Sequence, residues 1–554
     1  MAKLEKLELN VRGMTCDSCA LHVERALNRV RGVKQAQVPG WDSSEASVVA
    51  EEGIDAAALS EAVRQAGYLA KVRARQPLDE AGDEDGRGEG RFDLMVIGGG
   101  SAGFAAAIKG VELGFQVALV EALQIGGTCV NIGCVPSKTL IRSLEQYHLA
   151  GERRFRGIET NQGSIDWPQV IAHKDELVRE MRKAKYSDVL AAYPEITHLE
   201  GRARLTGGNG VEIGGEAFTP GKVLIATGAS PWAPPIPGLA EAGYLDSEAA
   251  LDLKDLPKSL IVLGANAVGL ELAQAYARAG TEVTVLELLP RIAPFEDGEI
   301  SAALTGYLEE EGMRIFTGFE TASVEKVDGR YVLHGTHNGD QRTFESDQLL
   351  VATGRRPNTA GLGLEEAGVR LGKRGEILVD NHLRTDNPDV YAIGDVLGRD
   401  MFVYVAAYDG ILAAENALTG AGRVYDAEYI ARITFTDPQI ASAGLTEAQA
   451  RERGHEVKVS TLEMRHVPRA LAARDTRGLI KLVADASTDR LLGAHILAPE
   501  AGEIIQTAVL AIRFGITVSE LRSTMFPYLT NAEGLKLAVL GFEKDVAMLS
   551  CCAG

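Results

Sequence analysis

The spacing of hydrophobic residues along the first 75 residues predicts a small domain of mixed helices and strands. Alternating apolar and polar residues predict strands, and apolar residues spaced three and four apart predict helices. The predicted order is strand, helix, strand, strand, helix, strand, over residues 3–11, 19–30, 33–38, 46–50, 55–66 and 68–73. This is the order of the ferredoxin-like βαββαβ fold. Residues 76–91 have no apolar face, and they predict a flexible acidic linker with a mean reach of about 20 Å.

From Phe92 the pattern changes to an apolar strand, a glycine-rich turn and a helix. Residues 92–97 predict the strand and residues 98–103 the turn. The arrangement recurs as a strand, turn, helix and strand over residues 260–263, 264–269, 270–279 and 282–287. Units of this kind bind dinucleotides. We therefore predict an α/β fold with two Rossmann-like domains, followed by an α+β interface domain over residues 429–554.

Composition limits the partners and the cellular setting. The chain has 554 residues, 45% of them hydrophobic, and a formal net charge of −20. Nucleic acid and anionic membranes would repel this charge. No apolar run approaches the roughly 20 residues of a membrane helix, and the charged start does not resemble a signal peptide. We expect a cytoplasmic protein with no nucleic-acid partner and no membrane insertion.

The six cysteines form three close pairs, Cys16/Cys19, Cys129/Cys134 and Cys551/Cys552. In a reducing compartment, close pairs are typical of metal binding or redox chemistry rather than of structural disulfides. The cysteine pairs therefore mark three candidate chemical sites.

The first glycine turn is a nearly complete dinucleotide fingerprint. Gly98 allows the tight turn, Gly100 lets the backbone approach a pyrophosphate, and Gly103 allows close packing of helix on strand. The pyrophosphate would lie on the helix N-terminus, at Ser101 and Ala102. Glu121 closes the next strand, where an acid binds a ribose hydroxyl.

Residues 126–138, GGTCVNIGCVPSK, carry the second cysteine pair. Cysteines five apart on an ideal helix are separated by about 7.5 Å of rise, so the helix start must be distorted for the sulfurs to meet. The segment resembles the redox-active segment of the flavin disulfide oxidoreductases, and the resemblance extends over residues 92–554. It implies FAD, a nicotinamide cofactor, Cys134 as the thiolate beside the flavin, Cys129 as the exchange thiol, and Lys138 near the isoalloxazine.

Further segments agree with this family. Thr227-Gly228 and Thr353-Gly354 each follow an apolar strand, and Gly394-Asp395 ends a segment similar to the second FAD motif. The resemblance places Thr128 among the cofactor-binding residues and implies that Asp395 binds the ribityl chain.

The second fingerprint, Gly264 to Gly269, departs from the pattern because Asn266 replaces the middle glycine. Asparagine tolerates a positive φ, so we expect the turn to survive with looser phosphate contact. Glu271 matches a family glutamate that lies beside a lysine near the flavin. Glu287 ends the next strand, where a carboxylate favours NADH over NADPH, whereas Arg291 offers a charge that favours NADPH.

Within the family, the C-terminal segment distinguishes the members. Tyr528 stands where the glutathione and lipoamide enzymes have an acid–base histidine, five residues before Glu533. A phenol with a pKa of about 10 is a poor proton shuttle near neutrality. This substitution resembles the mercuric reductases, which also place a second tyrosine, here matched by Tyr186, near the metal path.

The two remaining cysteine pairs fit metal transfer. Cys551 and Cys552 lie at the chain end, and the resemblance implies that this tail reaches the active site of the other subunit of a homodimer. Cys16 and Cys19 lie in GMTCDSC, which resembles the heavy-metal-associated domain. Thiols on a helix N-terminus have lowered pKa values and bind soft cations.

Together these features predict an enzyme that reduces thiol-ligated Hg(II) to Hg(0) with NADPH or NADH, FAD and six metal-binding cysteines. The expected domains are a heavy-metal-associated domain, an FAD-binding domain, a NAD(P)H-binding domain and a dimerisation domain, over residues 1–75, 92–245 with 358–428, 246–357, and 429–554. A dithiol–disulfide oxidoreductase similar to thioredoxin reductase or dihydrolipoamide dehydrogenase is the alternative.

Overall fold

The computed structural model describes residues 4–14, 17–41, 43–78, 92–426 and 429–548. The chain forms two compact units, residues 1–91 and 92–554. Among the described residues, none of the helices has the length and apolar character needed to cross a membrane.

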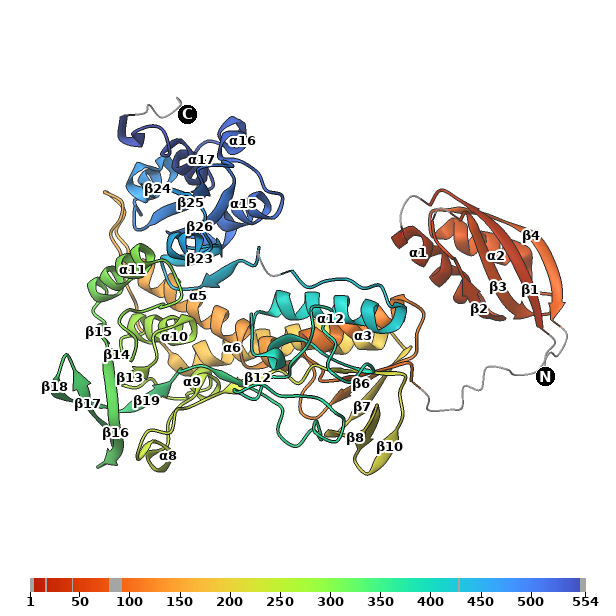
Figure 1. Cartoon of the computed structure of the whole chain (residues 1–554), viewed down its shortest axis with the longest axis horizontal. Coiled ribbons are helices and arrows are strands. Elements are labelled where there is room, and N and C mark those ends of the chain that lie inside the picture. Colours follow the sequence, from red (N-terminus) through yellow and green to blue (C-terminus); the bar gives the residue numbers. More distant parts are fainter. Residues whose placement is uncertain (1–3, 15–16, 42, 79–91, 427–428, 549–554) are drawn as a thin grey trace. The chain divides into compact units, whose positions relative to one another are not determined.

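The first unit is a four-stranded antiparallel sheet in the order β2-β3-β1-β4, with two helices (Figure 1). Leu7, Val48 and Leu59 are fully buried between the sheet and the helices. The predicted βαββαβ order is confirmed, with β1 at Leu4–Arg12, α1 at Asp17–Asn28, β2 at Val33–Gln37, β3 at Glu45–Glu51, α2 at Ala56–Gln65 and β4 at Leu69–Leu78.

One boundary of this unit differs from the prediction. The last strand continues to Leu78 because it pairs with β1, with Gln76 opposite Lys6. Residues 76–78 therefore belong to the sheet and not to the linker, although they lack an apolar pattern. The pairing partner supplies the hydrogen bonds that local sequence does not reveal.

The second unit begins with a five-stranded parallel sheet in the order β21-β11-β5-β6-β7. All four residues of β5 are buried, as expected for a parallel strand covered on both faces. Helices α3 and α12 pack closely because Gly410 has no side chain: a Cβ there would lie 2.3 Å from the carbonyl oxygen of Ala102. The strands are β5 Leu94–Ile97, β6 Val117–Glu121, β7 Ile196–Glu200, β11 Lys222–Ile225 and β21 Val390–Ala392.

A second parallel sheet, β15-β14-β13-β19, forms the other nucleotide-binding fold. Its strands are β13 Ser259–Leu263, β14 Glu282–Glu287, β15 Arg314–Thr317 and β19 Gln348–Val351. Antiparallel strands flank the two folds: β8 Ala203–Gly207, β9 Gly210–Ile213, β10 Glu216–Phe218, β12 Ala229–Pro231, β16 Phe319–Val327, β17 Arg330–His337, β18 Asp340–Ser346 and β20 Arg355–Pro357.

The C-terminal part of the unit is a five-stranded antiparallel sheet, β22-β23-β26-β25-β24, covered by helices (Figure 1). Its elements are β22 Arg432–Thr434, β23 Gln439–Gly444, α13 Glu447–Glu452, β24 Val457–Glu463, η3 Met464–His466, α14 Pro468–Ala473, β25 Leu479–Asp485, β26 Leu491–Ala498, α15 Ala501–Arg513, α16 Val518–Ser523, α17 Glu533–Leu540 and η4 Val546–Met548.

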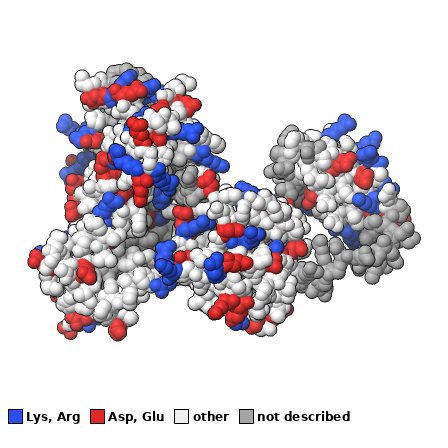
Figure 2. All heavy atoms as spheres, viewed as in Figure 1, with Lys and Arg blue, Asp and Glu red and all other residues white. Residues whose placement is uncertain are grey.

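The remaining helices connect and cover the two parallel sheets. They are α3 Ser101–Glu112, α4 Gly127–Asn131, α5 Cys134–Gly151, α6 Trp167–Arg182, the π-helix η1 Lys183–Ser187, α7 Asp188–Ala192, α8 Leu239–Ala242, α9 Ser247–Leu251, α10 Ala267–Arg278, α11 Gly298–Glu310, η2 Gly394–Leu397 and α12 Val403–Thr419. Acidic and basic side chains are interspersed over the face of the second unit seen in Figure 2.

Candidate active site

The central cysteine pair lies where a helix is interrupted. Cys129 is in α4, and Cys134 is the first residue of α5. Between the helices, Gly133 has φ −130° and ψ −106°, far from helical values. The predicted distortion of the helix start is confirmed, and it brings the two sulfur atoms into hydrogen-bonding contact as free thiols.

The two thiols differ in acidity. The hydrogen bond from Cys129, together with the positive charge of Lys138, lowers the pKa of Cys134 to about 7. The pKa of Cys129 is raised, chiefly because its proton is held in that hydrogen bond, and also by burial. Cys134 is therefore the thiol that ionises first, in agreement with the role the resemblance implied for it.

Lys138 connects this site to α10 of the second nucleotide-binding fold and to Phe435 in the C-terminal part of the unit. Its Nζ lies 2.6 Å from Oε2 of Glu271 in α10, and the other carboxylate oxygen accepts the N–H of Phe435 at 2.8 Å. The ammonium group also lies 4.6 Å from the centroid of the Phe435 ring. The predicted lysine–glutamate pair is therefore present, and the contact with Phe435 was not predicted.

Tyr186 lies in the π-helix η1, near enough to both cysteines to feel their charge. Its ring packs edge-on against Phe104 with centroids 4.8 Å apart, and its hydroxyl lies 3.4 Å from Oγ of Ser101. Burial raises the pKa of Tyr186, and the charges of Cys129 and Cys134 raise it further. The signal for this tyrosine in the sequence is weak, because a single π turn leaves no periodicity to read.

Asn131 and Arg182 hold the redox segment in place, and neither was predicted from the sequence. The Asn131 amide donates to the carbonyl oxygens of Ile125 at 3.1 Å and Gly127 at 2.9 Å. Arg182, just before the π-helix, donates to Asn131 Oδ1 at 3.0 Å. Helix α4, which carries Cys129, is thereby tied to the end of α6, from which the π-helix with Tyr186 continues.

The first nucleotide fold has the predicted glycine requirements. A Cβ on Gly98 would lie 2.3 Å from the carbonyl oxygen of Ala226, and one on Gly103 would lie 1.8 Å from the carbonyl oxygen of Gly98. Gly100 caps α3 without a side-chain hydrogen bond, so the first N–H groups of the helix remain available for an anion. Glu121 accepts the N–H of Gly99 at 2.7 Å.

The second glycine turn differs from the prediction in one respect. Asn266 has φ −102° and ψ −172°, an extended conformation that any residue adopts. Its tolerance of positive φ is irrelevant, because the positive φ of the turn, 100°, is at Gly264. Gly269 is required, since a Cβ there would lie 2.0 Å from the carbonyl oxygen of Gly264.

The other predicted cofactor residues surround the same sheet ends. Thr227 Oγ1 donates to the carbonyl oxygen of Asn358 at 2.7 Å, and Gly228 has φ 70°. Gly394 and Asp395 lie in η2, directly after β21. Burial raises the pKa of the Asp395 carboxyl.

The predicted C-terminal residues lie in the C-terminal part of the second unit. Tyr528 is 49% exposed in the loop before α17, and Glu533 accepts the N–H of Leu529 at 3.2 Å. Cys19 is in α1 of the first unit. Cys16, Cys551 and Cys552 lie outside the described residues.

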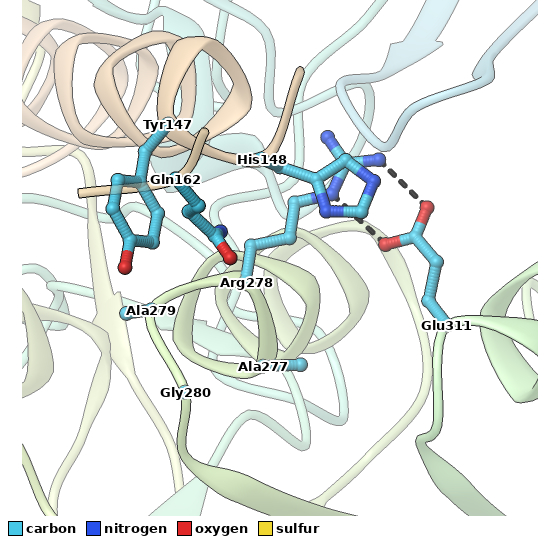
Figure 3. Close-up of a pocket in the computed structure, with 8 residues that line it drawn as sticks. All are labelled: Tyr147, His148, Gln162, Ala277, Arg278, Ala279, Gly280 and Glu311. Carbon is cyan, nitrogen blue, oxygen red and sulfur yellow. Dashed lines mark hydrogen bonds and ion pairs between the residues drawn. The ribbon is translucent and has the colours of Figure 1, made fainter. Parts of the chain in front are cut away.

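A polar pocket of about 230 Å³ lies near the other end of α5 from Cys134 (Figure 3). Arg278 pairs with Glu311 at 2.7 Å beside it, and with Asp437 at 2.8 Å. None of the predicted site residues lines the pocket. The lining residues are Tyr147, His148, Gln162, Ala277, Arg278, Ala279, Gly280 and Glu311. The pocket belongs to an ionic network that joins α10 to the C-terminal sheet.

Comparisons with known proteins agree with this geometry. Residues 92–410 match the pyridine nucleotide-disulphide oxidoreductase family, residues 430–539 its dimerisation domain, and residues 8–68 the heavy-metal-associated domain. The flavoprotein disulfide reductase RclA of Escherichia coli, solved as a Cu(II) complex, superposes with a TM-score of 0.74 at 31% identity, covering 81% of this chain and 99% of that one.

Curated relatives are more similar still. The mercuric reductase of Bacillus cereus is 44% identical over 100% of this chain and 88% of its own length. That of Streptomyces lividans is 48% identical over 84% of this chain and 98% of its own length. The chain therefore belongs to the mercuric reductases, within the pyridine nucleotide-disulphide oxidoreductase family.

Proposed function

We propose that this chain reduces Hg(II) to elemental mercury in the cytoplasm, with a reduced nicotinamide as electron donor. The balanced reaction is Hg(II) + NAD(P)H → Hg(0) + NAD(P)⁺ + H⁺. The observation that carries the proposal is the Cys129/Cys134 pair: two free thiols in contact, one with a lowered pKa, beside Lys138 and Tyr186.

The residues around this pair suit FAD. The uncapped N-terminus of α3 can bind a pyrophosphate, Glu121 a ribose, and Asp395 the ribityl chain. The chemistry that FAD supplies is two-electron transfer between the nicotinamide and the thiol-bound metal. Lys138 would lie beside the flavin ring, oriented by Glu271.

The two thiols have different tasks in this proposal. Cys134, which ionises near neutral pH, supplies the first thiolate ligand to Hg(II). When Hg(II) binds Cys134, it breaks the hydrogen bond between the two thiols. Cys129 then loses its own proton to the solvent, because metal binding displaces thiol protons. The neutral product atom has little affinity for thiolates and leaves.

Delivery of the metal is assigned to the other two cysteine pairs. Cys551 and Cys552 of one subunit of a homodimer would capture Hg(II), either from solution or from Cys16 and Cys19. They would pass it to the partner's redox pair by ligand exchange. The matches to a dimerisation domain and a heavy-metal-associated domain support this route.

Reduction of a disulfide substrate is the alternative function. It requires a proton donor for the leaving thiol. Tyr528, at the position of the family histidine, is a poor donor near neutrality. Metal reduction needs no such proton, so the tyrosine favours mercury as substrate.

The test is nicotinamide oxidation by the purified yellow protein. Thiol-ligated Hg(II) should trigger it and release volatile mercury, whereas glutathione disulfide and lipoamide should support little turnover. Cys134→Ser should abolish the Hg(II)-dependent rate. Turnover with a disulfide as fast as with Hg(II) would favour the alternative function.

A further inference from the structure

A buried carboxyl group lies directly behind the predicted flavin-binding segment. Asp409, in α12, is 2% exposed, and its Oδ2 accepts the N–H of Gly394 at 3.1 Å. Its other oxygen, Oδ1, is buried without a hydrogen-bond partner among the described residues. An aspartate this deeply buried is unusual unless all of its oxygens are paired, so a specific role for Asp409 is expected.

Gly394 is held in a conformation that the rest of the packing restricts. Its φ is 71°, and a Cβ on it would lie 3.2 Å from Cβ of Ala102 and 3.3 Å from Cβ of Ala406. Ala102 is in the first turn of α3, where the pyrophosphate is expected. The hydrogen bond to Asp409 therefore fixes Gly394, which packs against α3 on one side and precedes Asp395 in the chain.

We propose that Asp409 is a positioning residue for FAD: it orients Gly394 and Asp395, and its ionisation weakens flavin binding. This inference rests on the proposed function, which places FAD at α3 and Asp395. The orienting part depends on an acceptor oxygen at position 409. The ionisation part depends on negative charge close to the bound pyrophosphate.

The surroundings of Asp409 make its charge responsive to pH. Burial raises its pKa to about 6, while the Gly394 N–H and Arg399 oppose that rise and Asp400 and Asp395 add to it. The carboxyl is therefore neutral below about pH 6 and ionised above it. Arg399 offsets the effect of burial only in part. Its guanidinium lies 4.0 Å from the ring centroid of Tyr425, and one of its nitrogens is also buried without a partner among the described residues.

Other charged groups near α12 have partners of their own. The Tyr425 hydroxyl donates to Asp400 at 3.1 Å. Further along α12, Glu415 pairs with Lys109 at 2.9 Å and also with Arg423. Among these carboxyl groups, Asp409 is therefore the one expected to change its charge between pH 5.5 and 8.

Two substitutions separate the acceptor from the charge. Asp409→Asn keeps an oxygen for the Gly394 N–H and is neutral at every pH, whereas Asp409→Leu removes the acceptor. The readout is the free FAD released on serial dilution of the holoenzyme, measured by flavin fluorescence after ultrafiltration at pH 5.5 and pH 8. Glu415→Gln, on the same helix, is the matched control and should leave FAD affinity unchanged.

We expect Asp409→Leu to bind FAD about tenfold more weakly than the equally uncharged Asp409→Asn at both pH values, the effect of one lost hydrogen bond to a buried N–H. The ratio of the wild-type Kd to the Asp409→Asn Kd should rise by about threefold or more from pH 5.5 to 8, because only the wild type gains a charge. Thermal melting of each holoenzyme shows whether the variants fold.

Different outcomes would contradict the orienting role, the ionisation role and the proposed function. Equal FAD affinities of Asp409→Leu and Asp409→Asn would overturn the orienting role. An equal ratio of wild type to Asp409→Asn at the two pH values would overturn the ionisation role, and it can be measured even if the leucine variant does not fold. A wild-type protein that binds no FAD would instead overturn the proposed function.

Discussion

Glu121 and Glu287 occupy equivalent positions in the two nucleotide-binding folds. Glu121 accepts the N–H of Gly99 at 2.7 Å and of Leu123 at 2.7 Å. Glu287 accepts the N–H of Ala265 at 2.6 Å and of Leu289 at 2.8 Å. Each carboxylate closes the second strand of its fold and is held by the glycine turn, so each presents a fixed negative charge where an adenosine ribose binds.

This relationship predicts that NADH supports turnover at least as well as NADPH. A carboxylate repels the 2′-phosphate of NADPH and accepts hydrogen bonds from a free ribose. Arg291 does not offset it in the structure, because its guanidinium donates to the carbonyl oxygens of Pro294 at 2.9 Å and Glu296 at 3.0 Å. The measurement is kcat/KM for both cofactors.

Glu287→Arg should shift the preference toward NADPH by about ten- to a hundredfold, the effect of one charge-assisted contact. Arg291→Ala is the control and should leave the preference unchanged. A wild-type preference for NADPH of a hundredfold or more would show that other residues decide the choice.

The acidity of Cys134 should depend on its two neighbours. Because Cys129 and Lys138 both lower its pKa, Cys129→Ala and Lys138→Met should each raise it above the wild-type value of about 7. In the reduced wild-type protein the thiolate is populated above that pH and lost below it. Alkylation of Cys134 by iodoacetamide, followed across pH 5–10 by peptide mass, gives the pKa; no shift in either variant would contradict the electrostatic account.

Replacing both Cys551 and Cys552 by alanine should spare flavin binding and flavin reduction by the nicotinamide. Turnover of thiol-ligated Hg(II) should fall by orders of magnitude, since the relay to the redox pair is lost. Stopped-flow absorbance separates the two half-reactions. Full turnover in the double variant would rule out delivery by the tail.

Deleting residues 1–91 should leave a folded enzyme that reduces Hg(II) in vitro. Residues 92–554 form a compact unit of their own, and the predicted active-site residues that the structure describes lie in it. Flavin content, melting temperature and kcat of the truncated chain are the measurements. Loss of FAD would mean that the first unit is structural.

Local sequence was sufficient for much of this protein. Hydrophobic periodicity predicted the order of the βαββαβ domain, and the glycine spacing predicted both nucleotide turns. Gly98 and Gly264 each have a positive φ and face a carbonyl oxygen with no room for a side chain, so the requirement is visible residue by residue. The spacing of Cys129 and Cys134 alone implied a broken helix.

Other features depend on residues brought together from distant parts of the chain. Asp409 meets Gly394, Glu271 meets Phe435, and the last residues of β4 meet β1 only after the domains fold. Tyr186, in a single π turn, meets Phe104 and Ser101 near the cysteines. The physical reason is that periodicity and motif spacing report the backbone and the buried face, whereas hydrogen-bond partners, burial and pKa values are properties of the packed tertiary structure.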